Sequence, residues 1–415
     1  MKSLVIAPVV PADAGNGLAM RVGMFVEALH GLGAVDVLVL PVASRDIGST
    51  ALCRRLDICP TIIEVAGRGD TQLALIRSLS NAQARLEAFR QYARPSLSGF
   101  LSAPVLRDVR AHLGSNMYDL VHVARSYLLP SIASLGGSFG GIVSVDLDED
   151  DAETYRRIGR VQGLRGDLHA QDWNEAEAIA FDHQLAAGLP RHALSFIATA
   201  PEQRAIMARF GIAPIVAGNA VAIPAAPAGP GAAGQLLFVG GLGYPPNLDA
   251  ALWLLEEILP LIKERSSLPV SLTLVGRDPP ANIVELAARS GATLQADVED
   301  LAPFYRQASI ALVTVRAGGG SRIKLLEAAA YGVPVVATTL GAENSSLEAA
   351  LWIADTPDAI AEACLGIWAD PGKAARRAAQ ARLRVVEHFS RPAMISTLKR
   401  HFANRFAGAG LGDGL

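Results

Sequence analysis

The 415-residue chain is poor in the features that mark several classes of protein. It has three cysteines, Cys53, Cys59 and Cys364, an odd number without zinc-type spacing, so we expect neither a disulfide framework nor a metal site. Charged residues make up only 19% and the net charge is −3, so the basic field of a nucleic-acid-binding protein is missing. No apolar run approaches the roughly 20 residues that span a membrane. These absences predict a soluble, cytoplasmic protein that binds no nucleic acid.

Two familiar phosphate-binding motifs are missing as well. The first predicted strand, Leu4–Ala7, is followed by Asp13-Ala-Gly-Asn-Gly17 instead of Gly-x-Gly-x-x-Gly, and no glycine-rich loop ends in Gly-Lys-Ser/Thr. The apolar N-terminus is also too short and too soon interrupted by Pro11 for a signal peptide. We therefore interpret it as a buried strand.

Hydrophobic residues, in contrast, make up 51% of the chain, in short apolar runs that alternate with helical patterns. Such alternation predicts βαβ units and parallel sheets. The Pro/Ala/Gly-rich stretch from Ile223 to Gly234 is typical of a linker. We predict two Rossmann-like domains, residues 1–222 and 235–385, with a C-terminal helix in 386–415 that returns to the first domain.

The predicted elements follow this division. Strands are expected at Leu4–Ala7, Val35–Leu40, Thr61–Val65, Leu120–Val123, Ile142–Val145, Ser195–Ala198, Leu236–Val239, Ser271–Val275, Ile310–Val315 and Val333–Thr338. Helices are expected at Leu18–Leu32, Leu73–Ala93, Asn247–Glu264, Asn282–Ser290, Val298–Ala308, Ser321–Tyr331 and Lys373–Phe406, the last broken near Pro392.

The expected helix Leu73–Ala93 is rich in arginine. Arg77, Arg85, Arg90 and Arg94 stand against a single acid, Glu87. A solvated helix face is the first explanation of this pattern, and a docking surface for an anionic lipid or an anionic acceptor is the alternative. The helix therefore leaves peripheral contact with the inner face of a membrane open.

The strongest candidate site follows the strand that ends at Val315. Three glycines, Gly318, Gly319 and Gly320, precede an expected helix that begins with Ser321, and a helix start offers amides and a positive dipole to a diphosphate. Arg322 and Lys324 add positive charge. Glu327 lies on the apolar side of the same helix, where an acid needs hydrogen bonds such as those of ribose hydroxyls. A plain glycine-rich turn with a solvated glutamate is the other reading of these residues.

The segment from Gly318 to Asn344 resembles the donor site of group 1 (family-four) retaining glycosyltransferases. The likeness extends through Leu236 to Asn247, Leu272 to Pro280 and Ala296 to Ile310. It implies the GT-B fold, in which two Rossmann-like domains with parallel sheets face a central cleft. In the first half it is carried more loosely by Gly15-Asn-Gly17, Tyr118 to Val123 and Gly218 to Val221.

The resemblance also implies roles for individual residues. Glu327 would hold the donor ribose, Val298 would lie near the nucleobase, and Gly17 would approach the donor phosphates from the first domain. The donor-binding residues expected in this way are Gly17, Gly241, Arg277, Val298, Gly318, Gly319, Gly320, Ser321, Arg322, Lys324 and Glu327. Lys324 and Glu327 are also expected to take part in catalysis.

The sequence departs from the family at three places. The first acid of the family's Glu-x7-Glu motif falls at Gly319, the Arg/Lys pair after the domain's first strand is replaced by Gly241 to Asn247, and Ser144 to Glu153 holds six acids where relatives have a histidine. We therefore assign the phosphate charge to Arg322 and Lys324.

In the first domain, four residues are expected near the acceptor. Asp146 and Asp148 could bind acceptor hydroxyls, with Asp148 as a catalytic base, and Arg125 and Tyr127 could join them. A helix start capped by aspartates explains the same acids without any acceptor. His122 is expected to be a core histidine.

The sequence thus predicts a metal-independent, retaining glycosyltransferase without a cofactor. It would move a sugar from a nucleotide-diphosphate sugar to a hydroxyl of a sugar, lipid-linked or small-molecule acceptor, in the synthesis of a glycan, glycolipid or glycosylated metabolite. A non-catalytic module on the same fold, and a nucleotide-sugar epimerase or phosphorylase-like enzyme, are the alternatives.

Overall fold

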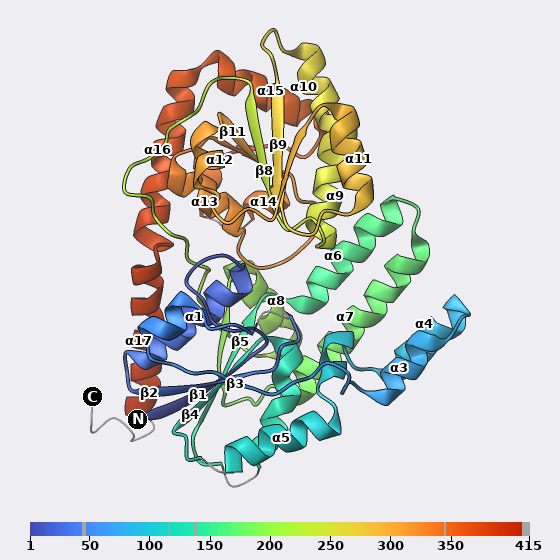
Figure 1. The fold of residues 1–415 in the computed structure, drawn as a ribbon, viewed down its shortest axis with the longest axis vertical. Coiled ribbons are helices and arrows are strands. Elements are labelled where there is room, and N and C mark those ends of the chain that lie inside the picture. The colour runs from blue at the N-terminus through green and yellow to red at the C-terminus, as the bar shows by residue number, and fades with distance from the viewer. Residues whose placement is uncertain (44–46, 115, 137–138, 344–345, 409–415) are drawn as a thin grey trace. The chain divides into compact units, whose positions relative to one another are not determined.

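The computed structural model describes residues 1–43, 47–114, 116–136, 139–343 and 346–408, which divide into two compact units. The N-terminal unit comprises residues 1–219 together with the end of the chain from Pro392, and the C-terminal unit comprises residues 220–391. Both units are α/β layers built on a parallel sheet (Figure 1).

The N-terminal unit has a seven-stranded sheet of order β3-β2-β1-β4-β5-β6-β7. Its strands are β1 Lys2–Ala7, β2 Ala34–Val39, β3 Thr61–Ile62, β4 Leu120–Ala124, β5 Ile142–Asp148, β6 Leu194–Ile197 and β7 Ile215–Val216. The central strands are buried along their length, because helices cover both faces of a parallel sheet.

The helices of this unit are α1 Gly17–His30, α2 Ala51–Arg55, α3 Thr71–Ser78, α4 Ala82–Tyr92, α5 Ala103–Gly114, α6 Asp151–Leu164, α7 Leu168–Gly188, α8 Ala200–Phe210 and α17 Arg391–Gly408, with 3₁₀ turns η1 Ser96–Phe100 and η2 Ser126–Leu135. The last helix, α17, packs on this unit, where the buried ring of Phe402 lies 6.3 Å from that of Phe25 and 5.4 Å from that of Phe196.

The expected single helix Leu73–Ala93 is wrong. Leu79 is extended and ends α3, and α4 starts after Asn81, whose side chain accepts a hydrogen bond from the Ala84 amide at 2.8 Å. An asparagine at a helix start competes with helix continuation, because its side chain caps the free amides. Arg77 therefore lies on α3, Arg85 and Arg90 lie on α4, and Arg94 follows α4.

The C-terminal unit has a six-stranded parallel sheet of order β10-β9-β8-β11-β12-β13. Its strands are β8 Gln235–Val239, β9 Ser271–Gly276, β10 Thr293–Ala296, β11 Ile310–Val313, β12 Val335–Ala337 and β13 Trp352–Ile353. Numbered within the unit this is order 3-2-1-4-5-6, the Rossmann order, whose direction reverses between β8 and β11.

The helices of this unit are α9 Pro245–Trp253, α10 Leu259–Arg265, α11 Ala281–Ser290, α12 Ala302–Gln307, α13 Ile323–Tyr331, α14 Thr339–Ala342, α15 Pro357–Ala369 and α16 Pro371–His388, with a π-turn η3 Leu254–Ile258 and a 3₁₀ turn η4 Glu348–Ala350. The predicted break near Pro392 is confirmed, since α16 ends at His388 and α17 begins at Arg391. The expected helix Asn247–Glu264 begins two residues earlier, at Pro245.

The Pro/Ala/Gly-rich stretch from Ile223 to Gly234 lies along the C-terminal unit. The Ala228 amide donates to the Tyr331 carbonyl at 2.8 Å, and the Gly231 amide donates to the Ala308 carbonyl at 2.8 Å. The division of the chain falls before this stretch, after Asn219, and again after Arg391.

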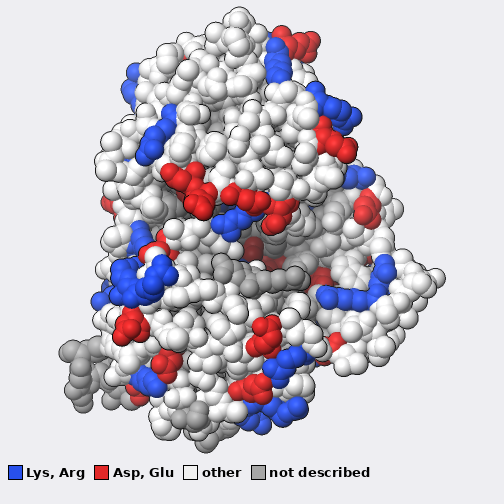
Figure 2. Space-filling view, viewed as in Figure 1, with Lys and Arg blue, Asp and Glu red and all other residues white. Residues whose placement is uncertain are grey.

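Charged side chains are sparse on the surface, as the composition requires. On the face drawn in Figure 2, small groups of both signs are separated by wide uncharged areas. No helix among the described residues is both long enough and apolar enough to span a membrane.

Candidate functional site

The C-terminal unit places the glycine-rich loop where Rossmann sheets bind ligands. The loop follows β11, and Gly240 and Gly241 follow β8, so both lie at the carboxyl ends of the two strands between which the strand order reverses. A Cβ added at Gly240 would lie 3.0 Å from Nζ of Lys324, and a Cβ at Gly241 would meet nothing within 4 Å. The lack of side chains at these positions keeps the strand ends open.

The glycine-rich loop is held in shape by Arg322. Gly318 and Gly320 have φ angles of +103° and +67°, a region that only glycine adopts without strain. The Arg322 guanidinium donates to the carbonyls of Gly319 and, at 3.1 Å, of Gly318. In this conformation Arg322 braces the loop, and to meet a phosphate it would have to leave these carbonyls.

Lys324, in the first turn of α13, points toward the end of β8. Its Nζ donates to Oδ1 of Asn247 and lies 5.1 Å from the centre of the Phe238 ring. Burial lowers the pKa of Lys324 to about 7, and the nearby positive charge of Arg322 adds to this shift. The hydrogen-bond partner of Lys324 is a neutral amide. An anion bound nearby would therefore stabilise the protonated form of Lys324.

Glu327 lies one turn further along α13. Its Oε2 accepts a hydrogen bond from the Tyr305 hydroxyl of α12 at 3.0 Å. Burial raises the pKa of Glu327, while Tyr305 and Lys324 oppose the rise. A half-buried carboxyl group with one hydroxyl partner keeps acceptor positions for further hydroxyls.

Sequence reasoning missed the two neutral partners of these charges. Asn247 was expected as the first residue of a helix, but the helix starts at Pro245, and the Asn247 side chain bridges Lys324 and the Gly241 carbonyl. Tyr305 gave no signal beyond the periodicity of its helix. The sheet brings these residues together although they lie far apart in the sequence.

The other expected donor residues of this unit also follow strand ends. Arg277 comes directly after β9 and is exposed, and Val298 is half-buried against the core shortly after β10. Ser321 lies just before α13, which begins at Ile323, later than expected. Asn344, the last residue of the resembling segment, lies outside the described residues.

A cavity of about 440 Å³ lies beside this loop at the ends of β11, β12 and β13. Its lining includes Arg316, Thr339, Glu343 and Asp355. The Arg316 guanidinium binds both carboxylate oxygens of Asp249, at 2.7 and 3.0 Å, and lies over the Trp253 ring. In the described part of the chain, no group of three or more His, Cys, Asp or Glu is arranged to hold a metal ion.

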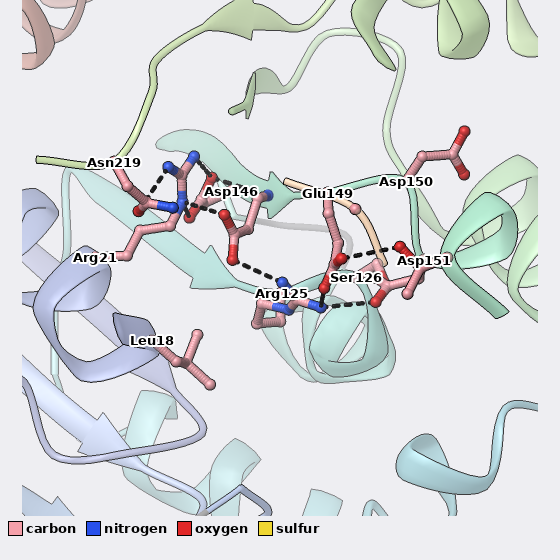
Figure 3. A network of polar contacts seen from close by, with 12 residues as sticks. Leu18, Arg21, Arg125, Ser126, Asp146, Glu149, Asp150, Asp151 and Asn219 are labelled. Carbon is pink, nitrogen blue, oxygen red and sulfur yellow. Dashed lines mark hydrogen bonds and ion pairs between the residues drawn. The ribbon is translucent and has the colours of Figure 1, made fainter. Parts of the chain in front are cut away.

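In the N-terminal unit, a network of charged side chains lies around the end of β5 (Figure 3). Arg21 of α1, only 1% exposed, binds both oxygens of Asp146 at 2.7 Å. Its remaining Nη1 donates to the Ala217 carbonyl at 2.9 Å and to Oδ1 of Asn219 at 3.3 Å. Burial raises the pKa of Asp146, and the Arg21 charge opposes the rise. The pair is therefore buried and its hydrogen bonds are largely satisfied.

Arg125 forms the second half of this network (Figure 3). It binds Oδ2 of Asp148 at 2.7 Å, Oε1 of Glu149 at 2.8 Å and Oδ1 of Asp151 at 2.7 Å, and the Ser126 hydroxyl donates to the other oxygen of Asp151. Arg125 and Asp148 both have positive φ angles, +79° and +63°. Burial raises the pKa of Asp151 to about 7, with Arg125 opposing the rise and Glu149 adding to it.

This network bears on the four residues expected near an acceptor. Both carboxylate oxygens of Asp146 accept hydrogen bonds from Arg21, and Arg125 forms ion pairs with three other acids. Asp148 is 15% exposed at its side chain but lies between two guanidinium groups, with Arg21 Nε at 3.2 Å. Tyr127 is 3% exposed and packs in the apolar core. Of the four, Asp148 alone combines a carboxylate with some access to solvent.

Two other predicted positions of this unit can be located. Gly17 is the first residue of α1, directly after the capping Asn16. His122 lies in β4, fully buried and stacked on Phe25 with ring centres 4.4 Å apart, and burial lowers its pKa to about 3. It is a core histidine, as expected. Arg21 was missed, although a lone arginine between Met20 and Val22 in an apolar helix was a visible signal.

Residues 233–370 match the family model described as glycosyl transferases group 1. Most of the C-terminal unit is therefore similar to the group 1 glycosyltransferases. The matched range holds β8 to β13 and with them the glycine-rich loop, Lys324 and Glu327. No curated protein sequence matches the chain.

The fold of the whole chain is similar to that of known GT-B glycosyltransferases. Sucrose-phosphate synthase from Thermosynechococcus elongatus aligns with a TM-score of 0.65 at 18% identity, over 98% of this chain and 99% of that one. α,α-Trehalose 6-phosphate synthase from Burkholderia multivorans aligns with a TM-score of 0.65 at 13% identity, over 100% and 98%. HepE from Anabaena, solved with UDP-glucose, aligns with a TM-score of 0.64 at 13% identity, over 97% and 100%. The predicted GT-B fold is confirmed.

Proposed function

We propose that the protein is a retaining glycosyltransferase whose C-terminal unit holds a nucleotide-diphosphate sugar. The observation that carries the proposal is the pair of charges on α13, Lys324 and Glu327, each bound to one neutral partner beside a glycine-rich strand end. Such a pair suits a ligand with an anionic diphosphate and neutral ribose hydroxyls. The match of residues 233–370 to the group 1 glycosyltransferase model supports this assignment.

In the proposed reaction the sugar–phosphate bond breaks and the diphosphate leaves with its electron pair. Lys324 and the amides at the start of α13 stabilise the negative charge that develops on the diphosphate oxygens. The half-buried Glu327 holds the ribose and so orients the donor. Arg322 contributes its charge if it leaves the loop carbonyls. No cofactor and no metal ion are assigned a step.

The oxygen of the acceptor hydroxyl bonds to the anomeric carbon on the face from which the diphosphate departs, which retains the anomeric configuration, and the hydroxyl proton passes to the departing diphosphate. Residues of the N-terminal unit would bind the acceptor, and Asp148 is the carboxylate we assign to its hydroxyls. Acting as a base would require Asp148 to release Arg21 or Arg125. The acceptor class remains a sugar, a lipid-linked sugar or a small molecule.

The donor is tested by thermal unfolding of the full chain with UDP, GDP, ADP and dTDP. UDP is the first choice, because HepE was solved with UDP and with UDP-glucose. A nucleotide at about 100 times its dissociation constant adds roughly 2.7 kcal/mol to the free energy of unfolding. We expect one nucleotide to stabilise the protein, Glu327→Gln to reduce the shift, and Glu285→Gln, at an exposed position of α11, to leave it unchanged.

Transfer is then tested with the matching nucleotide sugar and a panel of acceptors, with the product anomer assigned by NMR. A product of inverted configuration would refute retention. Stabilisation by no nucleotide would refute the donor site, and nucleotide binding without transfer to any acceptor would favour a non-catalytic binding module.

A further inference from the structure

A second cavity lies wholly within the N-terminal unit, between the helix pairs α3–α4 and α6–α7. Figure 1 shows α6 and α7 as an antiparallel pair with α3 and α4 beside them. The cavity has a volume of about 450 Å³, within the range of roughly 300–1,000 Å³ that small-molecule sites occupy. The residues on its wall that matter here are Arg77, Arg85, Gln162, His169, Trp173 and Asn174.

The charge on this wall is positive. Two arginines from different helices, Arg77 of α3 and Arg85 of α4, face the cavity, and its lining includes no acid. Within the described residues Arg77 has no hydrogen bond or ion pair, and Arg85 uses only Nη1, which donates to the Leu79 carbonyl at 3.2 Å. The nearby charge of Arg77 opposes the rise in pKa that burial imposes on Glu177, but the Glu177 carboxylate accepts its hydrogen bond from the Ser96 amide.

The other two arginines of this stretch are engaged differently. Arg94 pairs with Asp70 at 2.8 Å and Arg90 lies 3.7 Å from Glu87. Two arginines from different helices, Arg77 and Arg85, thus converge on one cavity, and the two that follow them in the chain lie against acids.

The rest of the wall suits a ring with polar substituents. The Trp173 ring is stacked on Phe89, with centres 4.5 Å apart, which fixes its position in the wall. Asn174 donates to Oε1 of Gln162 at 2.7 Å and to the Ala170 carbonyl at 2.8 Å. In the described structure this leaves Oδ1 of Asn174 and Nε2 of Gln162 without hydrogen bonds.

We propose that this cavity binds a phosphate or carboxylate group carried on a ring. Arg77 and Arg85 bind the anion through charge-assisted hydrogen bonds, and Trp173 packs against the ring. The site is independent of the donor site and would hold even if the chain transferred no sugar. The anion can belong to a soluble molecule or to a lipid headgroup.

The test measures binding of phenyl phosphate to the full chain by calorimetry, with phenol and inorganic phosphate as partial probes. We expect saturable binding of phenyl phosphate in the millimolar range or tighter, and weaker binding of either partial probe. The double variant Arg77→Gln/Arg85→Gln should weaken it at least about tenfold. Arg90→Gln, on the exposed side of α4, should change it by less than about twofold.

Unchanged thermal unfolding of the double variant shows that it is folded. Absence of saturable binding to the wild type, or equal weakening by Arg90→Gln, would overturn the proposal. Given binding of phenyl phosphate, retention on vesicles that contain phosphatidylinositol, whose headgroup carries its phosphate on a ring, identifies a lipid headgroup as the ligand if the double variant loses it. Phenyl phosphate binding without retention identifies a soluble ligand.

Discussion

Both units have charged side chains near the carboxyl ends of their parallel strands, but the partners of these charges differ. In the N-terminal unit, Arg21 and Arg125 are bound to four acids that follow or end β5. In the C-terminal unit, Lys324 is bound to an amide and Glu327 to a hydroxyl.

The difference shows how a buried charge can indicate either a support or a binding site. A buried ion pair with filled hydrogen bonds fixes the backbone around it, and a ligand gains little by replacing one partner. A charge whose hydrogen-bond partner is neutral, as for Lys324 and Glu327, leaves an electrostatic requirement that an ionic or polar ligand can meet. The first arrangement suits the scaffold and the second suits a ligand.

The largest expected effect comes from breaking the N-terminal network. Arg21→Met leaves the carboxylate of Asp146 buried without its bidentate partner, and removal of one partner of a buried pair costs about 3–5 kcal/mol. Urea unfolding should show this loss. Arg55→Met is the matched control, because Arg55 also pairs with a residue of α1, Glu27, but at the surface, where such pairs contribute about 0–1 kcal/mol.

A double variant sharpens this result. Arg21→Met/Asp146→Asn removes both charges, so it should recover part of the stability lost in the single variant. If Arg21→Met and Arg55→Met cost the same, Arg21 is not a support and the contrast between the units fails.

How much the sequence reveals follows the same division. The glycine-rich loop, Lys324 and Glu327 lie within ten residues of one another on a strand–loop–helix unit, so their chemistry could be predicted from local pattern. Asp146 and Arg21 lie 125 residues apart, and only the sheet order brings α1 against the end of β5. The sequence therefore predicts Asp146 and Asp148 as acceptor ligands, because it does not show that Arg21 and Arg125 bind them.

The helix over Leu73–Ala93 failed for a local reason that composition hides. The arginine and alanine content of this stretch favours one long helix. Asn81 instead caps the start of α4, and this cap offsets the free-energy cost of interrupting the helix. Asn247 shows the opposite error. It follows two prolines and was expected at the start of a helix, but its amide oxygen accepts a hydrogen bond from Lys324.

The second prediction concerns Lys324→Met. Replacing a half-buried ammonium by an apolar side chain of similar length should leave the free energy of unfolding equal or higher, because burial already disfavours the charge. Donor affinity should fall by about 1.5–3 kcal/mol, the range of hydrogen bonds to charged groups. Lys263→Met, on the exposed side of α10, is the matched control and should change neither.

The pH dependence of donor binding distinguishes charge from shape. In the free protein Lys324 has a pKa lowered to about 7, and a bound diphosphate would raise it, so binding takes up a proton above pH 7. Affinity for the nucleotide sugar should be constant just below this pH and fall above it, by up to about tenfold per pH unit. The slope should vanish in Lys324→Met. A slope of the same size in that variant would contradict the role of Lys324.

The smaller expected effect in the N-terminal network is that of Asp151→Asn, which tests whether this network is fully ionised. The folded pKa of Asp151, about 7, lies above the value of about 3.9 for an unfolded chain. Between these values the folded state holds the proton and the unfolded state does not, so Asp151 favours folding less and less as pH rises toward 7. Asparagine mimics the protonated acid and keeps a partner for Ser126. The stability of the variant relative to the wild type should therefore be higher near about pH 8 than near about pH 5, by roughly 2–3 kcal/mol. If Asp151→Asn loses the same stability at both pH values, Arg125 needs all three carboxylates ionised. The whole N-terminal network would then be ionised in the folded protein.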